Sequence, residues 1–334
     1  MYKRSPGKKA TNSRTTQNAV ASFDEIKQNR RKLWREAIKW PLYSIAVMPV
    51  ILAAGWTIGY NQELRIVQFI GFLIASVLLL LWENLTNDLF DAETGVDEVG
   101  KPHSIVTLVG EKGPIKQIAF ISLLIGLLII YFLAVNSSKS VFTLVFIACI
   151  LGYLYQGPPF RLGYQGLGEP LCWIAFGPLA TAAALLVISP IKDINEIIKI
   201  PWETALIIGT GPAIATTLVL FCSHFHQVKE DAAHGKNSPL VRLGTRKASS
   251  LIPWLISLSF ACEWIPIING NLPISAYLGI IGLAPSLKLI RLLSKHHNKP
   301  NLTKESKFLA LRFQALNGFG FSFGIALAPF LNLT

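Results

Sequence analysis

Long apolar runs alternate with short polar segments along most of the chain. A helix needs roughly 20 mostly apolar residues to cross the hydrocarbon core of a bilayer, and about nine runs reach or approach that length. These runs cover residues 40–60, 65–89, 116–135, 140–157, 169–189, 202–225, 249–268, 273–293 and 308–331. Gly and Pro interrupt several runs, a feature that is tolerated where neighbouring helices satisfy the backbone. The pattern predicts an all-α, multi-pass membrane protein.

The segment before the first apolar run is polar and basic. Residues 1–20 have the composition of a disordered tail. Residues 23–40 predict a helix that lies on the membrane surface, with a transit peptide as the alternative. The apolar anchors of that surface helix would be Phe23, Ile26, Leu33, Trp34 and Ile38. We therefore expect two parts, a basic tail over residues 1–39 and a transmembrane domain over residues 40–334.

The chain is 51% hydrophobic and only 15% charged, which is too apolar for an ordinary soluble protein. Its net charge of +12 raises the question of a nucleic-acid partner. With nine spans and a cytoplasmic N-terminus, only four of the 31 Lys and Arg residues fall on the opposite side. These four are Arg65, Lys139, Lys192 and Lys199. This asymmetry follows the positive-inside rule, so the charge records orientation in a lipid bilayer and we expect no nucleic acid partner.

An acidic cluster stands at the inner end of the second run. In "WENLTNDLFDAETGVD", residues 82–97, Asp88 and Asp91 are three apart and share a helix face with Asn84 and Asn87. The next glycine is expected to end that helix. Carboxylates this close repel each other unless a cation neutralises them, and Mg²⁺ takes oxygen ligands that it commonly shares with substrate phosphates. The cluster indicates either a Mg²⁺ site or a solvated helix end.

A second cluster follows the sixth run, in "CSHFHQVKEDAAHGKNSPLVRLG", residues 222–244. His224, Gln227 and Asp231 have the spacing of one helix face, and Glu230 lies beside that face. Three basic residues follow, namely Lys229, Lys236 and Arg242. Carboxylates that hold a cation, with basic groups nearby, are what a diphosphate requires.

Zinc is a weaker interpretation of the second cluster. His224 and His226 are two residues apart, which on a helix points their side chains about 200° apart. That spacing disfavours a zinc ion held by both rings on a single helical turn. Hydrogen bonding at the membrane interface is the simpler role for this histidine pair.

A third inner segment, "YLYQGPPFRLGYQGLGEP", covers residues 153–170. It combines aromatic residues and glycines with a single basic residue, Arg161. Tyr153 and Arg161 would offer an aromatic contact and a positive charge to a substrate at the membrane surface. The alternative is a tight loop with interfacial tyrosines.

These segments together resemble the UbiA superfamily of intramembrane aromatic prenyltransferases. "NDLFDAETGVD" at 87–97 is similar to the first aspartate motif of that superfamily. "YQGPPFRLGYQGLGE" and "EDAAHGKNSPLVRLGT" resemble its naphthoate branch, and "FCSHFHQ" is most similar to the cyanobacterial and plastid members. The resemblance covers about residues 35–330. The three inner motifs are specific together, whereas any one of them alone is not.

The resemblance and the patterns above assign roles to individual residues. The implied catalytic set is Asp88, Asp91 and Asp231. The implied Mg²⁺ ligands are Asp88, Asp91, Asp97, Glu230 and Asp231. The implied substrate contacts are Asn84, Asn87, Lys101, Tyr153, Arg161, Gln227, Lys236 and Arg242. Gln227 stands where the family usually has an aspartate, and His226 where it usually has an arginine, so the second motif departs from the family pattern.

The resemblance also implies a fold and a reaction. The fold would be about nine helices around a central, lipid-open cavity, with both motifs facing each other at its cytoplasmic mouth. The reaction would be Mg²⁺-dependent transfer of a phytyl or other prenyl chain from its diphosphate to 1,4-dihydroxy-2-naphthoate (2-carboxy-1,4-naphthoquinone), with loss of CO₂, in phylloquinone or menaquinone biosynthesis. The expected location is a cell inner membrane or a thylakoid membrane.

Two other functions are weighed against this one. A prenyltransferase for another acceptor, such as homogentisate or 4-hydroxybenzoate, is the nearest, and the naphthoate-like "GPPFRLGYQGLGE" and "GKNSPLVRLG" count against it. A transporter or channel would carry ionisable residues deep within its spans. Here nearly all such residues lie at span ends, which favours the enzyme.

Overall fold

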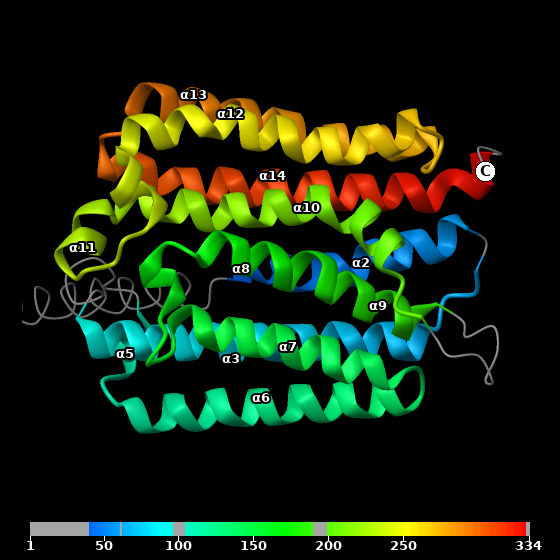
Figure 1. The fold of residues 1–334 in the computed structure, drawn as a ribbon, viewed down its shortest axis with the longest axis horizontal. Helices are drawn as coiled ribbons and strands as arrows, with labels where there is room; N and C mark the ends of the chain where they lie inside the picture. The colour runs from blue at the N-terminus through cyan, green and yellow to red at the C-terminus, as the bar shows by residue number, and fades with distance from the viewer. Residues whose placement is uncertain (1–39, 61, 96–103, 190–198, 332–334) are drawn as a thin grey trace, which may run out of the picture.

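The computed structural model describes residues 40–60, 62–95, 104–189 and 199–331, and within these ranges every regular element is a helix (Figure 1). The expected tail, Asp97 and Lys101 lie outside the described residues. Eight helical segments are long and apolar enough to cross a membrane, and the shorter α2 adds another apolar helix. The all-α, multi-pass fold expected from the apolar runs is therefore confirmed, and the chain is an integral membrane protein.

The spanning segments follow the apolar runs in order. Four of them join consecutive elements without leaving the span, which are α8 with η3 and α9, α10 with η4, η5 with α13, and α14 with η6. The bounds are η1 Trp40–Leu42, α2 Tyr43–Gly59, α3 Ile66–Thr94, α5 Ile105–Val109, α6 Lys112–Val135, α7 Lys139–Gln156, η2 Leu162–Gln165, α8 Gly168–Ile174, η3 Ala175–Leu179, α9 Ala180–Ile188, α10 Trp202–Ser223, η4 His224–His226, α11 Val228–Ala233, α12 Pro239–Ile268, η5 Ile274–Gly282, α13 Leu283–His296, α14 Pro300–Leu327 and η6 Ala328–Leu331.

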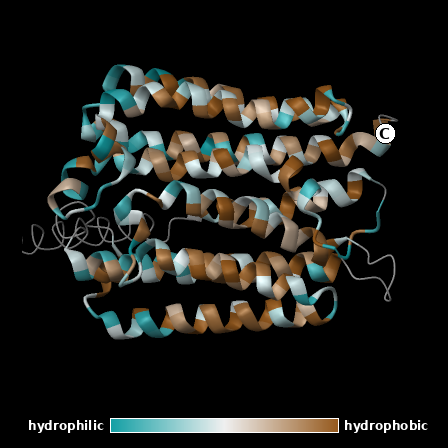
Figure 2. Ribbon diagram, in the orientation of Figure 1, coloured by the Kyte–Doolittle hydropathy of each residue, from teal (hydrophilic) through white to brown (hydrophobic). Residues whose placement is uncertain are grey.

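The long helices run side by side, so that the connections gather at two ends of the bundle (Figure 1). The short helices α5 and α11 both lie at the left end, beside the loop that contains η2. Apolar residues fill the middle of the bundle and polar residues gather toward the helix ends, as a bilayer requires (Figure 2). Helix α14 packs against α2, α10, α13 and η5, and α3 packs against α6.

The first motif lies on a helix that outlasts its apolar run. The expected run ends at residue 89, but α3 continues to Thr94. Gly95 then takes a left-handed conformation with φ of 79°, which confirms the expected helix stop. As a result the whole of "NDLFDAET" is helical, and its polar residues keep the spacing of one helix face.

The second motif does not lie on one helix, and that expectation was wrong. Helix α10 ends at Ser223, η4 forms a tighter turn, and Gln227 separates η4 from α11. Because of this break, the side chains after Gln227 point in other directions than a continuous helix would give them. The break nevertheless brings His224 Nδ1 to 3.0 Å from Asp231 Oδ2, so the two residues are neighbours through a turn.

The arrangement of the connections predicts a labelling pattern. Cysteines placed at Glu111 and Asn237, which are exposed near α5 and α11, should react with a membrane-impermeant maleimide from the same side. A cysteine at the exposed Lys139, which begins α7, should react only from the opposite side.

The side shared by Glu111 and Asn237 should be the cytoplasmic side, because the basic residues concentrate there. The unmodified chain, with its four free cysteines, measures the background of the assay. Labelling of all three positions from one side would contradict this arrangement of the helices.

Candidate active site

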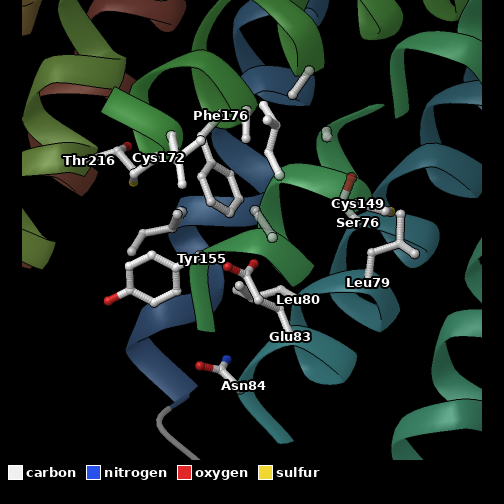
Figure 3. A pocket seen from close by; sticks show the side chains of 18 of the residues that line it. Ser76, Leu79, Leu80, Glu83, Asn84, Cys149, Tyr155, Cys172, Phe176 and Thr216 are labelled. Carbon is white, nitrogen blue, oxygen red and sulfur yellow. The ribbon is translucent and has the colours of Figure 1, made fainter. Parts of the chain in front are cut away.

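Two cavities meet at the inner end of the bundle. One is mostly apolar, has a volume of about 260 Å³ and lies among α2, α3, α7, α8 and α10 (Figure 3). The other is polar, has a volume of about 130 Å³ and is lined by residues of both sequence motifs. The side chains that line both cavities are Asn84, Asn87, Tyr155, Ser223 and Lys307. A molecule with a polar head and an apolar body could therefore occupy both at once.

The first motif forms one wall of the polar cavity. Asp88 and Asp91 are only 2% and 3% exposed, yet both line this cavity together with Asn84 and Asn87. Partners hold each carboxylate in place. The backbone N–H of Ile105 donates to Asp88 Oδ2 over 3.4 Å, whereas Asp91 Oδ1 accepts from two side chains.

The third inner segment supplies both partners of Asp91. Gln156 Nε2 donates to Asp91 Oδ1, and the Tyr164 hydroxyl donates to the same oxygen over 3.2 Å. Burial and the nearby charge of Asp91 raise the pKa of Tyr164, so its hydroxyl keeps the proton that it donates. Thr94 Oγ1 lies 2.7 Å from that hydroxyl. The segment thus braces the end of α3 from outside the helix.

The glycines of this segment make room for Tyr155. A Cβ on Gly163 or on Gly168 would lie 2.6 Å from Tyr155 Cε2, closer than real Cβ atoms approach. Any side chain at either position would displace the ring. Tyr155 lines both cavities, so these two glycines fix an aromatic wall where the cavities meet.

The second motif forms the opposite wall of the polar cavity. Gln227 and Lys236 are 8% and 5% exposed and line the cavity, and His226 lines it as well. Lys236 Nζ lies 5.3 Å from the centroid of the Tyr164 ring, a cation–π distance. The two walls therefore place carboxylates and amides from α3 opposite an amide and a cation that follow α10.

Asp231 lies behind this wall. It is fully buried and does not line either cavity. Its Oδ2 is 3.0 Å from His224 Nδ1, and its Oδ1 is 3.9 Å from Lys236 Nζ. Burial alone would raise the pKa of Asp231, but the hydrogen bond with His224 and the charge of Lys236 outweigh it, so the pKa is lowered. The carboxylate stays ionised and holds both neighbours.

Besides Asp231, four other described residues expected at the site lie outside both cavity linings. The exposed Tyr153 donates to Pro158 O over 2.9 Å, and Arg161 Nη2 lies 4.0 Å from Glu93 Oε2. Arg242 donates to the backbone carbonyls of Asn237 and Gln165 and so joins two loops. Glu230 is half-buried on α11. Direct contact of these four with metal or substrate stays a prediction.

Sequence reasoning missed several residues that shape the site. Lys307 on α14 lines both cavities, although it comes from a segment with no recognised motif. Tyr155 and Gln156 stood inside a quoted segment, but the pattern did not separate them from their neighbours. His224 lines the polar cavity, as its place in the motif suggested, but its ring also lies between Asp231 and Glu169, with Nε2 at 3.7 Å from Glu169 Oε1.

The polar cavity has the donor chemistry of a magnesium site. Within the described ranges no group of three or more His, Cys, Asp or Glu side chains is arranged to hold a metal. The cavity does gather two carboxylates with several amide side chains, and Mg²⁺ is usually bound by one or two carboxylates plus substrate phosphates. Two buried polar atoms of the lining residues lack a hydrogen-bonding partner in the protein, namely Asn84 Nδ2 and Gln156 Oε1. The donor set therefore fits Mg²⁺ shared with a phosphate ligand.

Two known proteins match most of the length of this chain. The chain is 37% identical to the 2-carboxy-1,4-naphthoquinone phytyltransferase of Synechocystis sp., over 86% of this chain and 91% of that protein. It is 36% identical to the chloroplastic 2-carboxy-1,4-naphthoquinone phytyltransferase of Arabidopsis thaliana, over 93% of this chain and 81% of that protein.

A solved structure has the same fold. The structure of a UbiA homolog from Archaeoglobus fulgidus bound to DMAPP and Mg²⁺ superposes with a TM-score of 0.52, at 13% identity, over 86% of this chain and 99% of that one. The family model described as the UbiA prenyltransferase family matches residues 46–313. The expected resemblance is confirmed, and the chain belongs to the UbiA prenyltransferase family.

Proposed function

We propose that this chain transfers a phytyl chain from phytyl diphosphate to 1,4-dihydroxy-2-naphthoate with loss of CO₂. One observation carries the proposal, which is the junction of a polar, carboxylate-lined cavity with an apolar cavity at the inner end of the bundle. A prenyl diphosphate has a charged head and a hydrocarbon tail, so its two parts match the two cavities. The two phytyltransferases at 36–37% identity support the choice of phytyl donor and naphthoate acceptor.

The polar cavity would bind the diphosphate head. Asp88 and Asp91 would hold Mg²⁺, with amide oxygens from Asn84, Asn87 and Gln227 lining the same cavity. Bound Mg²⁺ supplies positive charge that stabilises a departing diphosphate. Two lysines from different parts of the chain, Lys236 and Lys307, line this cavity as well and would contact the phosphate oxygens.

The second motif would position one of these lysines. Asp231 sits beside Lys236 and pairs with His224, so it fixes the direction from which the ammonium group enters the cavity. Asp231 was expected as a metal ligand and a catalytic residue. Because it lies behind the cavity wall, we propose that it acts through Lys236 and His224.

The apolar cavity would keep water from the reacting carbon atoms. In the transfer, the bond between the allylic carbon and the diphosphate oxygen breaks, and its electron pair leaves with the diphosphate. The ring carbon that bears the carboxylate forms the new carbon–carbon bond. Loss of CO₂ then returns an electron pair to the ring, so no proton is gained or lost overall. A dry cavity prevents water from capturing the allylic group instead.

The orientation and membrane of the chain are part of the proposal. The concentration of basic residues at the end of the bundle that holds the site favours a cytoplasmic active site and a cytoplasmic N-terminus. A cell inner membrane or a thylakoid membrane would house the protein.

Product analysis tests the function directly. The full chain in liposomes, given Mg²⁺, phytyl diphosphate and 1,4-dihydroxy-2-naphthoate, should release one CO₂ for each phytylated naphthoquinol that forms. Homogentisate and 4-hydroxybenzoate serve as control acceptors and should give little product. Faster transfer to either control acceptor, or product without CO₂ release, would show that the acceptor is assigned wrongly.

Replacement of Asp88 or Asp91 by Asn should abolish most of the activity without unfolding the protein. The substitution keeps the shape but removes a charge that a hard cation requires. We expect turnover to fall by roughly two orders of magnitude or more, which corresponds to a loss of about 3 kcal/mol of transition-state stabilisation. Thermal stability in detergent should change little, because the paired carboxylates repel each other in the metal-free protein.

Glu93, the carboxylate that lies 4.0 Å from Arg161, provides a matched control. Glu93→Gln also keeps the shape and removes a charge from the same helix, outside both cavities, and should keep near-normal turnover. A folded Asp88→Asn or Asp91→Asn variant with near-normal turnover would eliminate the metal role of that residue.

Gln227 and Asp231 should differ in their effects. Gln227→Ala removes one neutral ligand at the cavity and should weaken the response to Mg²⁺ only moderately. Asp231→Ala leaves Lys236 and His224 without their buried partner, so it should reduce turnover more. Activity measured against Mg²⁺ concentration for both variants checks this ranking. A larger loss of activity in Gln227→Ala than in Asp231→Ala would mean that the Gln227 amide, and not the Asp231 carboxylate, positions the second motif at the polar cavity.

A further inference from the structure

The apolar cavity contains a carboxylate that the reaction as described above does not use. Glu83 on α3 lines this cavity, and its side chain points into it (Figure 3). Among the described residues that line the cavity, Glu83 is the only carboxylate, and most of the others are apolar. It does not line the polar cavity, so it stands apart from Asp88 and Asp91. Sequence analysis did not single it out.

The Glu83 side chain is half-buried, and within the described part of the chain no hydrogen bond or ion pair joins its carboxyl group to another side chain or to the backbone. A Cβ on Gly152 would lie 3.6 Å from Glu83 Cδ and 3.7 Å from Oε1, so a glycine keeps space open beside the carboxyl group. A carboxyl group left in such a place costs free energy unless a ligand completes its hydrogen bonds.

The chemistry of the two substrates decides which of them could be that ligand. The hydrocarbon tail of a prenyl diphosphate has no group that could hydrogen-bond to a carboxylate, and its diphosphate would be repelled by one. The aromatic acceptor carries ring hydroxyl groups, which donate hydrogen bonds. Its own carboxylate would turn away from Glu83, because like charges repel in an apolar cavity.

The position of Glu83 along α3 also suits an acceptor. Asn84 is its neighbour and Asn87 is one turn further on, and these two side chains line both cavities. A diphosphate head in the polar cavity would place its allylic carbon near that junction. Glu83 lies on the apolar side of the junction, within the same helical turn, where a ring must lie to reach the allylic carbon.

We propose that Glu83 binds the aromatic acceptor by accepting a hydrogen bond from a ring hydroxyl group. The inference rests on the proposed function and adds the acceptor subsite to it. A hydrogen bond from the hydroxyl to Glu83 raises the electron density of the ring, which favours attack by the carbon that bears the carboxylate. The proton stays on the hydroxyl group when CO₂ leaves, so the protonation state of Glu83 is the same before and after the reaction.

Binding of two analogues tests the hydrogen bond without the reaction. The probes are 4-hydroxy-2-naphthoate and 4-methoxy-2-naphthoate, measured by calorimetry on the full chain in detergent, because the 4-hydroxyl lies away from the ring carboxylate and is free to donate. The unmodified chain should bind the hydroxy compound about tenfold more tightly, the usual effect of one hydrogen bond to a charged group. Glu83→Leu, which removes the acceptor of the bond, should bind both compounds with equal and weak affinity. Equal affinity of both compounds for the unmodified chain would overturn the proposal.

Steady-state kinetics separate the acceptor from the donor. Glu83→Leu should raise KM for the naphthoate about tenfold and leave KM for phytyl diphosphate within about twofold, whereas Glu83→Gln, which keeps an acceptor oxygen, should raise KM for the naphthoate less. Glu263→Gln is the control, because Glu263 is a buried carboxyl group that accepts a hydrogen bond from Asn317 and lines neither cavity. It should change thermal stability and keep both KM values. Parallel changes in both KM values of the Glu83 variants would contradict the assignment.

The outcomes also distinguish this inference from the proposed function. If the unmodified chain prenylates the naphthoate but Glu83→Leu keeps its KM, the inference fails and the function stands. If the unmodified chain prenylates only another aromatic acceptor, the function fails. The KM of that acceptor in Glu83→Leu then decides the inference, since any hydroxyl-bearing acceptor should lose affinity by the same factor.

Discussion

The whole site depends on keeping two carboxylates one helical turn apart and nearly buried while they remain open to a small polar cavity. Asp88 and Asp91 would repel each other if nothing opposed the repulsion. The backbone N–H of Ile105, Gln156 and the Tyr164 hydroxyl each contribute a hydrogen bond to one of the two side chains. These partners come from separate connections at the same end of the bundle, so the loops there act as a frame for the end of α3.

A second frame holds the positive side of the cavity. The line from Glu169 through His224 and Asp231 to Lys236 joins α8 to the segment after α10. Tyr164 then links the two frames, because its hydroxyl contacts Asp91 and its ring lies beside Lys236. A ligand that neutralises the carboxylates would therefore also change the surroundings of the lysine, without any large movement of the helices.

Much of the fold followed from the sequence, because a membrane leaves few alternatives. Apolar runs of the required length can only be helices in lipid, so their order was predicted correctly. Their predicted number, nine, fits approximately, because eight described segments are long enough to span and α2 is shorter. The ends of the helices were predicted less well. Hydropathy marks where the hydrocarbon stops, whereas α3 and α14 continue beyond it as polar helices, and α12 begins with a polar turn that a kink at Gly244 separates from its apolar part. The break at Gln227 was missed because helical spacing in that segment described a face that no continuous helix presents.

The site was predicted in part, for a related reason. Motif residues on the regular helix α3 were placed correctly relative to each other, since the spacing of a helix fixes which side chains share a face. Residues brought in from elsewhere, such as Lys307 on α14 and Tyr164 in η2, depend on how the helices pack. No pattern within one segment of the sequence shows how distant helices pack against each other. The same holds for Glu83, whose importance appears only once the cavity beside it is known.

The length of α3 has a consequence for where the reaction takes place. Its 29 residues extend over about 44 Å, at 1.5 Å per residue, whereas the hydrocarbon core is only about 30 Å thick. A helix that enters the hydrocarbon core at Ile66 leaves it after about 20 residues, so the turn that holds Asp88 and Asp91 would stand at the depth of the lipid headgroups. A lipid-like diphosphate can enter sideways from its own leaflet with its phosphates already at the correct height. The bilayer thus sets the depth of the donor before the protein binds it, and a bilayer of different thickness would shift that match.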